Sequence, residues 1–279
     1  MKKKTLLVSS LFKKNKYYLN KFINSINKQT DQKFDILFSK DEDNYNHYLK
    51  KIRNKKEIII IREMLPITLN KYRILKKIKN LNYQNIIFQD SDDTFDKDRI
   101  KISKKLLLRN DFIIGDIILK KKKIFSEYFR NNQKITIYDL LKGNIAGYGN
   151  ISLKKNIITN IKLEKLKNIS SKVTAIDWIT WLIFLQGVKK IIFSSKVKVF
   201  YNSRILSQSS LLRINLSKFR ENIKVQYETF KNLSKFSKIY KLRFQFIKKN
   251  YIKCETKKFN QRFELFKNKY KKIWFYLPI

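Results

Sequence analysis

The stretch Ile86-Ile87-Phe88-Gln89-Asp90-Ser91-Asp92-Asp93 decides the fold that we expect for this chain. A short apolar run ends abruptly in three carboxylates. Asp96 and Asp98 follow, so positions 90–98 hold five of the 13 aspartates. In open α/β sheets, ligands bind at the carboxyl ends of the strands. An apolar strand that leads straight into carboxylates therefore predicts a ligand site at this edge of a sheet.

The chemistry of these carboxylates indicates the kind of ligand. Crowded carboxylates repel one another, and each raises the pKa of its neighbours. Asp90 and Asp92, in the spacing Asp-x-Asp, offer hard oxygen ligands suited to Mg²⁺ or Mn²⁺ carrying a phosphate. We interpret the cluster as the metal and diphosphate site of an enzyme that uses a nucleotide-activated donor.

Two other interpretations of the cluster are available. An EF-hand loop starting at Asp90 would need glycine at its sixth position and glutamate at its twelfth. Phe95 and Lys101 stand there instead, which excludes a calcium loop of that type. The plainer alternative is a set of acidic turn residues with a helix cap at Asp98, since aspartate is common at caps and in first turns. The apolar strand before the cluster favours the ligand site.

Composition limits the kind of partner. The chain has 279 residues, of which 43% are hydrophobic, enough for one large domain or one domain with an appendage. A net charge of +42 first suggests nucleic acid. Lysine outnumbers arginine 53 to 11, although arginine is the better bidentate reader of phosphates and bases. Nucleic acid is therefore disfavoured, although a basic surface could still favour an anionic membrane or an anionic substrate.

Cysteine and histidine each occur once, as Cys254 and His47. No intramolecular disulfide can form, which is typical of a reducing compartment. A zinc cluster of cysteine and histidine is excluded, and any Ser-His or Cys-His relay would depend on His47, in a polar, loop-like stretch. The first 12 residues imitate a signal peptide but lack a cleavage site, and no apolar run approaches the roughly 20 residues of a membrane span. We expect a cytoplasmic protein, soluble or peripheral on the inner face of the cell membrane.

Apolar strands alternate with amphipathic helices along the first 200 residues. The expected strands are 5–8, 35–38, 57–62, 85–89, 111–119 and 191–200, and the expected helices lie around 18–26, 74–81, 100–108 and 174–185. This order is typical of βαβ units with a parallel sheet. The four consecutive isoleucines in 57–62 predict a strand that is buried on both faces. No Walker or dinucleotide fingerprint is present.

Two further stretches have a possible chemical role. Residues 143–150 hold three of the five glycines, which predicts either a close backbone approach to a ligand or a tight loop. Asp177 is the only charged residue in the apolar helix 174–185 and the last aspartate in the chain. With Thr174 as the cap, Asp177 resembles a capping box. Burial beside Trp178 and Trp181 would instead raise its pKa toward that of a useful general base. The two roles are compatible.

The character of the chain changes after about residue 206. Residues 211–279 carry 19 Lys+Arg, four Glu and no Asp, with many aromatic residues in segments of helical pattern. Basic amphipathic helices with aromatic residues can lie on an anionic membrane. The alternative, which the pattern favours, is a small helical appendage with solvated basic faces.

Several segments together resemble the family 2 glycosyltransferases, which have the GT-A fold. The residues that carry the resemblance are Leu7-Val8-Ser9-Ser10, Ile26-Asn27-Lys28-Gln29-Thr30, Phe34 to Asp41, Phe88 to Asp93, Gly147 to Leu153, and Ala175-Ile176-Asp177-Trp178. The resemblance implies an α/β GT-A domain over residues 1–205, with a Rossmann-like, mostly parallel central sheet flanked by helices. A basic, aromatic-rich helical region would occupy residues 206–279.

The resemblance also implies a function. It implies inverting transfer of a sugar from a nucleotide-sugar donor, with a UDP-sugar favoured, to a hydroxyl of a glycan or lipid-linked acceptor in cell-surface polysaccharide synthesis. Asp92, with Asp90 beside it, would hold Mg²⁺ or Mn²⁺. The implied site residues are Asp177 as the catalytic base, Ser9, Asp41, Asp90 and Arg204 around the nucleotide-sugar, and Gly147, Asn150 and Trp178 toward the acceptor.

The sequence departs from the family pattern at two places. Ile176-Asp177 stands where the family often has Glu-Asp, and Tyr201-Asn202-Ser203-Arg204 stands where many members have Tyr-Arg-x-His. Either Arg204 neutralises the leaving diphosphate or the site is altered. The alternatives to an active transferase are a degenerate transferase subunit, a nucleotidyltransferase, and a non-enzymatic basic protein that binds nucleic acid or an anionic membrane surface.

Overall fold

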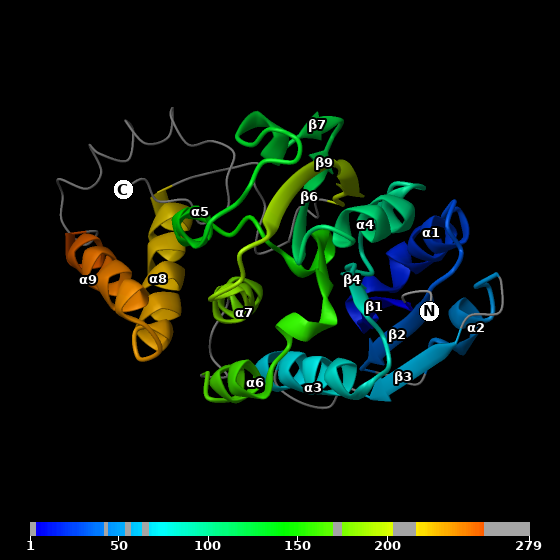
Figure 1. Ribbon diagram of the computed structural model, residues 1–279, viewed down its shortest axis with the longest axis horizontal. Coiled ribbons are helices and arrows are strands. Elements are labelled where there is room, and N and C mark those ends of the chain that lie inside the picture. The colour runs from blue at the N-terminus through cyan, green and yellow to red at the C-terminus, as the bar shows by residue number, and fades with distance from the viewer. Residues whose placement is uncertain are drawn as a thin grey trace.

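The computed structural model describes residues 4–41, 44–53, 57–62, 67–169, 175–202 and 216–253. Within these ranges, nine strands form one sheet in the order β3-β2-β1-β4-β8-β6-β9-β5, with β7 paired to β6. The strands are β1 Thr5–Leu11, β2 Asp35–Lys40, β3 Ile58–Arg62, β4 Asn85–Phe88, β5 Thr94–Phe95, β6 Phe112–Leu119, β7 Lys122–Lys123, β8 Ile151–Lys154 and β9 Ile191–Phe200. Figure 1 shows the sheet running through the middle of the molecule.

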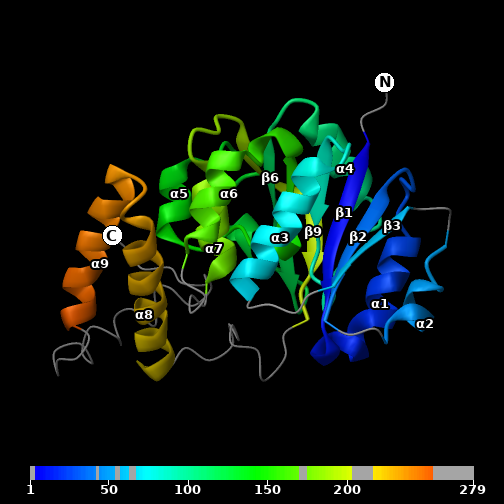
Figure 2. The same cartoon turned by 90° about the horizontal axis from the view of Figure 1, so that it is seen from below.

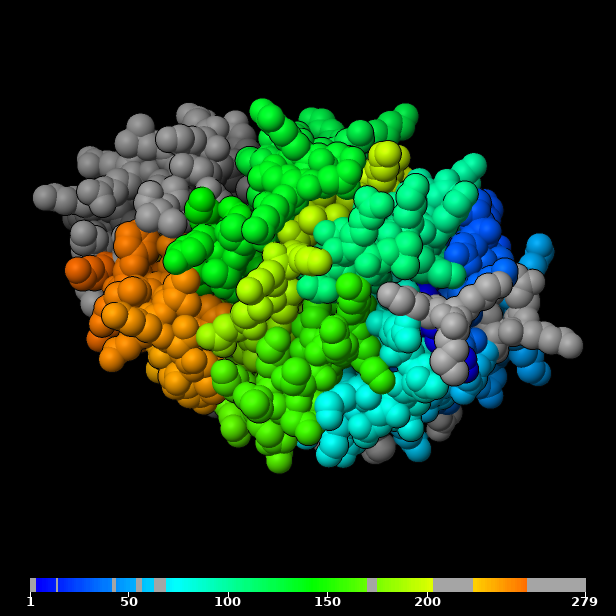
Figure 3. All heavy atoms as spheres, viewed as in Figure 1, coloured from blue at the N-terminus to red at the C-terminus, as the bar shows by residue number. Residues whose placement is uncertain are grey.

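Helices cover both faces of the sheet. They are α1 Lys16–Asn27, α2 Asn46–Leu49, α3 Ile67–Asn80, α4 Arg99–Leu107, α5 Ile137–Lys142, α6 Asn160–Lys167, α7 Ile176–Leu185, α8 Leu216–Leu233 and α9 Lys238–Lys253. Figure 2 shows β1 and β2 between α3 on one side and α1 with α2 on the other. On the surface, α3 and α6 lie side by side (Figure 3). The expected α/β class with a central sheet and flanking helices is confirmed.

The alternation of side chains along β1 explains the two layers. Leu6 and Val8 belong to the large apolar core shared with α3 and α7, whereas Leu7 belongs to the core shared with α1. Successive residues of a strand point to opposite faces, so a strand covered by helices on both faces must be apolar throughout.

The sheet is parallel in one half and mixed in the other. Strands β3, β2, β1 and β4 run parallel, whereas β8 is antiparallel to both β4 and β6, and β9 is parallel to β6 but antiparallel to β5. The carboxyl ends of β1, β2 and β4 therefore meet at one edge of the sheet. The predicted ligand site after β4 lies at this edge.

The strand with four isoleucines differs from the prediction. β3 lies at one end of the strand order, and Ile60 is 43% exposed. The prediction that this strand is buried on both faces is wrong, because an apolar run in the sequence does not distinguish a central strand from an edge strand.

Helix α7 is the most buried helix near the site. Of its ten residues only Asp177 is not buried, as expected for a helix that is apolar all round. Gly187, with φ of +80°, follows the helix in the left-handed conformation that glycine adopts without strain. Ala175 occupies the N-cap without a side-chain cap, and Thr174, the predicted cap, lies outside the described residues.

Helices α8 and α9 pack on α7. The rings of Trp178 and Phe230 meet edge to face at 5.4 Å between centroids, and the Tyr240 hydroxyl donates to the Leu182 carbonyl oxygen at 2.5 Å. Val225 and Leu233 join the same apolar core. The described part of the region predicted as an appendage is therefore continuous with the core of the sheet domain. None of the described helices combines the length and apolar character needed to cross a membrane.

We expect Phe230→Ala to lower the free energy of unfolding of the whole chain by about 3–5 kcal/mol, since it removes a fully buried ring from the core. Leu242 of α9 is 56% exposed, so Leu242→Ala is the control and should change the free energy of unfolding by less than about 0.5 kcal/mol. Urea unfolding followed by tryptophan fluorescence measures both. If Phe230→Ala left the main transition unchanged, α8 would be an independent unit.

Candidate active site

The acidic loop after β4 is fixed to β1 by its serine. The Ser91 hydroxyl donates to the Ser10 carbonyl oxygen at 2.6 Å and accepts from the Asn15 side-chain amide at 3.1 Å. The Gln89 N–H donates to the Val8 carbonyl oxygen at 2.9 Å, so the strand pairing continues into the loop. Ser91, the middle residue of the Asp-x-Asp spacing, therefore fixes the positions of Asp90 and Asp92.

The end of β9 closes on the same loop from the other side. The Asn202 N–H donates to Asp93 Oδ1 at 2.8 Å, and the Asn202 side-chain amide donates to the Asp92 carbonyl oxygen at 2.5 Å. The segment that begins Tyr201-Asn202 thus lies against the acidic loop. Arg204, predicted near the diphosphate, lies outside the described residues.

A buried arginine lies beneath the carboxylates. Arg99 is fully buried, and its Nη2 donates to the Phe88 carbonyl oxygen at 2.7 Å. Burial lowers the pKa of its guanidinium to about 9, against the opposing effect of Asp90 and Asp93. Arg99 therefore remains charged near neutral pH and partly offsets the negative charge of the loop.

Ionisation of the carboxylates in this loop is still unfavourable. Burial, followed by the charges of Asp92 and Asp177, raises the pKa of Asp90 to about 7, although Lys71 and Arg99 act in the opposite direction. Burial and the charges of Asp92 and Asp90 also raise the pKa of Asp93 well above its ordinary value. An additional cation at this loop would relieve the repulsion.

The glycine-rich loop at 147–150 lies directly over the carboxylates. A Cβ on Gly149 would lie 2.7 Å from Asp90 Oδ2, so only glycine fits there without movement of Asp90. The Asn150 side-chain amide donates to the Gly115 and Ile145 carbonyl oxygens at 2.9 and 3.1 Å, and its Oδ1 accepts from the Gly147 N–H at 2.8 Å. Asn150 thus fixes the shape of the loop.

Asp177 lies in the first turn of α7 and remains 32% exposed at its side chain. Its Oδ2 accepts from the Tyr148 N–H at 3.4 Å, and its Oδ1 lies 4.0 Å from Lys71 Nζ. The same ammonium group lies 3.3 Å from the centre of the Tyr148 ring, a cation–π contact. Burial raises the pKa of Asp177, while Lys71 and the Tyr148 N–H act in the opposite direction.

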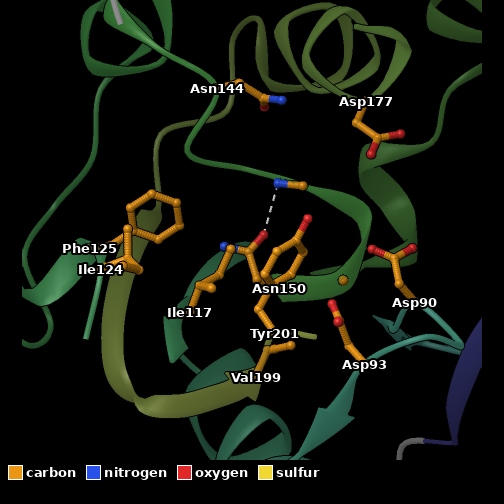
Figure 4. A pocket seen from close by; sticks show the side chains of 12 residues that line it. Asp90, Asp93, Ile117, Ile124, Phe125, Asn144, Asn150, Asp177, Val199 and Tyr201 are labelled. Atoms are coloured by element: carbon orange, nitrogen blue, oxygen red, sulfur yellow. Dashed lines mark hydrogen bonds between the residues drawn. The ribbon is translucent and has the colours of Figure 1, made fainter. Parts of the chain in front are cut away.

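One pocket brings the two predicted centres together. Asp90 and Asp177 both line it, with Gly147 and Asn150 from the predicted acceptor loop (Figure 4). Its full lining is Asp90, Asp93, Ile117, Ile124, Phe125, Asn144, Gly147, Gly149, Asn150, Asp177, Val199 and Tyr201. A carboxylate from the end of β4 and a carboxylate from the start of α7 therefore face one space.

Of the predicted site residues that the structure describes, four lie outside this lining. Asp92 precedes the lining residue Asp93 in the acidic loop, and Ser9 is buried within β1. Asp41, after β2, accepts from the Tyr45 hydroxyl at 2.7 Å and from the Lys13 N–H at 3.1 Å. Trp178 is a core residue, and its indole N–H donates to the Leu140 carbonyl oxygen at 2.7 Å.

The residues that sequence reasoning missed carry weak sequence signals. Lys71 and Arg99 are two among 64 basic residues, and no spacing sets them apart. Asn202 belongs to the segment that departs from the family pattern, and this departure is the only feature of the sequence that draws attention to it.

The described residues contain no group of three or more histidine, cysteine or acidic side chains that could hold a metal by themselves. Asp90 and Asp92 offer two carboxylate donors to a hard cation, so the remaining ligands of such a cation would have to come from a ligand such as a diphosphate. The crowding of the carboxylates is consistent with such a ligand set.

The fold is that of known nucleotide-sugar glycosyltransferases of the GT-A type. S. aureus TarS 1–349 in complex with UDP-GlcNAc matches with a TM-score of 0.60 and 14% identity, over 81% of this chain and 66% of that chain. The mannosyltransferase PcManGT from Pyrobaculum calidifontis, in complex with GDP-Man and Mn²⁺, matches with a TM-score of 0.52 and 11% identity, over 85% of this chain and 66% of that one. The chain thus spans just under two thirds of each of these two chains. No family model and no curated protein matches it.

The raised pKa of Asp90 predicts a pH-dependent gain in stability for Asp90→Asn without metal. Below about pH 4, Asp90 is protonated in the folded and the unfolded chain, so the substitution has little effect. Between about pH 4 and 7, the unfolded chain loses the proton first, which lowers the free energy of unfolding as pH rises. At pH 8 the variant should be more stable by on the order of 2–4 kcal/mol. The measurement is urea unfolding of both proteins at about pH 4 and at pH 8, with chelator present. Equal stability of the variant and the unmodified protein at pH 8 would contradict the electrostatic description.

Proposed function

We propose that this chain is an inverting, metal-dependent glycosyltransferase. It would move a hexose unit from a nucleotide-sugar to a hydroxyl of a glycan or lipid-linked acceptor in cell-surface polysaccharide synthesis. The observation that carries the proposal is that Asp90 and Asp177 line one pocket in a fold shared with nucleotide-sugar transferases. A metal-bound leaving group and a general base must face the same reacting carbon.

The donor side is assigned to the acidic loop. Asp92 and Asp90 would hold Mg²⁺ or Mn²⁺ with the diphosphate, and the cation would offset the charge that develops on the leaving group. The neighbours in complex with UDP-GlcNAc, UDP, and GDP-Man with Mn²⁺ support this kind of ligand. Asp41, at the end of β2, would contact the nucleotide base, with the backbone near Ser9 beside it.

Asp177 is proposed as the general base. The acceptor oxygen would attack the anomeric carbon while the bond from that carbon to the diphosphate oxygen breaks on the opposite face. Asp177 would take the hydroxyl proton as the new bond forms. Its raised pKa makes the ionised carboxylate a stronger proton acceptor, and it retains an exposed surface toward the pocket.

Lys71 is proposed as a positioning residue for this base. It is buried, and it contacts both Asp177 and the ring of Tyr148, whose N–H donates to the second oxygen of Asp177. The lysine therefore restrains the carboxylate and the backbone beside it. It also favours the ionised form of Asp177, the form that accepts a proton.

Peripheral attachment to an anionic membrane remains part of the proposal. Exposed lysines on and between α8 and α9 would meet such a surface, and they are Lys224, Lys231, Lys235, Lys238, Lys241, Lys248 and Lys249. Each lysine near an anionic surface adds roughly 1 kcal/mol of attraction.

Calorimetric titration with UDP and GDP, each with Mn²⁺ and with chelator, tests the donor site. We expect one nucleotide to bind only with Mn²⁺, and Asp92→Ala to abolish that metal-dependent binding. Asp98→Ala is the matched control, because this carboxylate belongs to the same acidic segment but is not assigned to the metal, and it accepts from the Thr30 hydroxyl at 2.7 Å. Affinity that is independent of metal, or unchanged by Asp92→Ala, would contradict the assignment.

Turnover of the bound nucleotide-sugar tests the base and its lysine, with release of nucleotide as the readout. Asp177→Asn should lower kcat by about 10²–10⁴-fold while donor affinity stays the same. Lys71→Met should also lower kcat with unchanged donor affinity. Lys71→Arg should recover part of the lost kcat. A weakened donor affinity in Lys71→Met would instead indicate that Lys71 contacts the donor. A near-normal kcat in Asp177→Asn would contradict the assignment of Asp177 as the general base.

A further inference from the structure

The pocket that holds Asp90 and Asp177 has two chemically different sides. Carboxylates lie along one side, whereas Ile117, Ile124, Phe125 and Val199 form the other, which we call the apolar wall, and Tyr201 lies between the two sides (Figure 4). The carboxylate side is accounted for by the proposed transfer chemistry. The apolar wall is not, because no step of that chemistry requires an apolar surface.

The apolar wall is built on paired strands. Ile117 of β6 lies in register with Val199 of β9, and the Ile124 N–H donates to the Ile117 carbonyl oxygen at 2.9 Å. The buried carboxylate of Asp116 accepts from the Phe125 N–H at 2.8 Å and also from the Ser126 hydroxyl. These bonds fix Ile124 and Phe125 in place, so the wall is a formed surface that does not require ligand to assemble it.

The wall gives a sugar hydroxyl little to bind. Its four aliphatic and phenyl side chains carry no hydrogen-bonding atom, and the polar atoms of neighbouring Asn150 are already used within the loop. A hydroxyl turned toward this wall would lose its hydrogen bonds to water without replacement, at a cost of about 1–3 kcal/mol. A methyl group in the same place would gain free energy from burial.

Asn144 adds the complementary polar group. It lines the same pocket, and its Oδ1 is buried without a hydrogen-bond partner among the described residues. A buried amide oxygen of this kind requires a donor, and an N–H group from a ligand supplies one. A substituent with both an N–H and a methyl group satisfies Asn144 and the apolar wall together.

We propose that the pocket selects a donor hexose that carries an acylamino substituent, with its methyl group on the apolar wall and its N–H toward Asn144. This inference rests on the proposed function, since it places the donor sugar between Asp90 and Asp177. It names the class of sugar, which the assignment of the metal and the base leaves open.

Paired UDP-sugars test the inference by calorimetry with Mn²⁺. UDP-GlcNAc should bind about 10–100-fold more tightly than UDP-Glc, because the pair differs only in the acetamido group. UDP-GalNAc and UDP-Gal give a second pair with the same difference. Metal-dependent binding of UDP with equal affinities within both pairs would overturn the inference and leave the proposed function standing. If UDP itself failed to bind, the UDP-sugar assignment and this inference would both fall.

Two isosteric variants on one strand sharpen the test. Val199→Thr adds a hydroxyl to the apolar wall at nearly constant volume and should reduce the UDP-GlcNAc to UDP-Glc affinity ratio by about tenfold. Val197→Thr makes the same change at a buried β9 residue that does not line the pocket, and it should leave the ratio intact. The ratio is measured within one protein, and affinity for UDP alone reports whether each variant is folded. An unchanged ratio in Val199→Thr, or an equal loss in Val197→Thr, would overturn the inference.

Discussion

Electrostatic repulsion among four carboxylates is the constraint on which the site depends. Asp90, Asp92 and Asp93 follow one another at the end of β4, and Asp177 approaches them from α7. Buried like charges are unfavourable, so the surrounding structure must hold them in place. The hydrogen bonds of Ser91 to the end of β1 are part of that support.

Two buried cations set the balance of charge. Arg99 lies beneath the acidic loop, and Lys71 lies beside Asp177. Together they offset part of the negative charge but leave the pKa values of Asp90 and Asp93 raised. A site that is still unbalanced after its own cations are counted favours a cationic ligand, and a metal with its diphosphate meets that requirement. Gly149 allows Asp90 to keep its position, because a larger residue would displace this carboxylate.

Much of the fold could be predicted from the sequence, because apolar runs and carboxylates at strand ends are local features. The strand before Asp90 and the apolar helix that carries Asp177 were both predicted, and the structure brings these two residues to one pocket. The metal and catalytic roles assigned to them remain proposals. The burial of β3 was predicted wrongly, since the position of a strand in the sheet depends on its partners and not on its own composition.

Other features of the site depend on tertiary contacts and left no local signal. In the sequence, Lys71 cannot be distinguished from a surface lysine, and only the structure shows its contact with Tyr148. In the same way, only the structure shows that Asn202, after the end of β9, donates to Asp93. Trp178, expected toward the acceptor, faces Phe230 of α8 and belongs to the core. A helical pattern alone does not say which side of the helix a later segment covers. The described helices α8 and α9 pack against α7 and so help to hold the helix that carries Asp177 in place.

The most direct test of the central claim is a crystal structure with Mn²⁺ and an intact UDP-sugar, made with Asp177→Asn to slow turnover. We expect Mn²⁺ to lie between the carboxylates of Asp90 and Asp92 and the diphosphate. We also expect the anomeric carbon to lie in the pocket of Figure 4, with residue 177 on the face opposite the leaving group. A sugar bound away from residue 177, or Mn²⁺ bound away from Asp90 and Asp92, would contradict that claim.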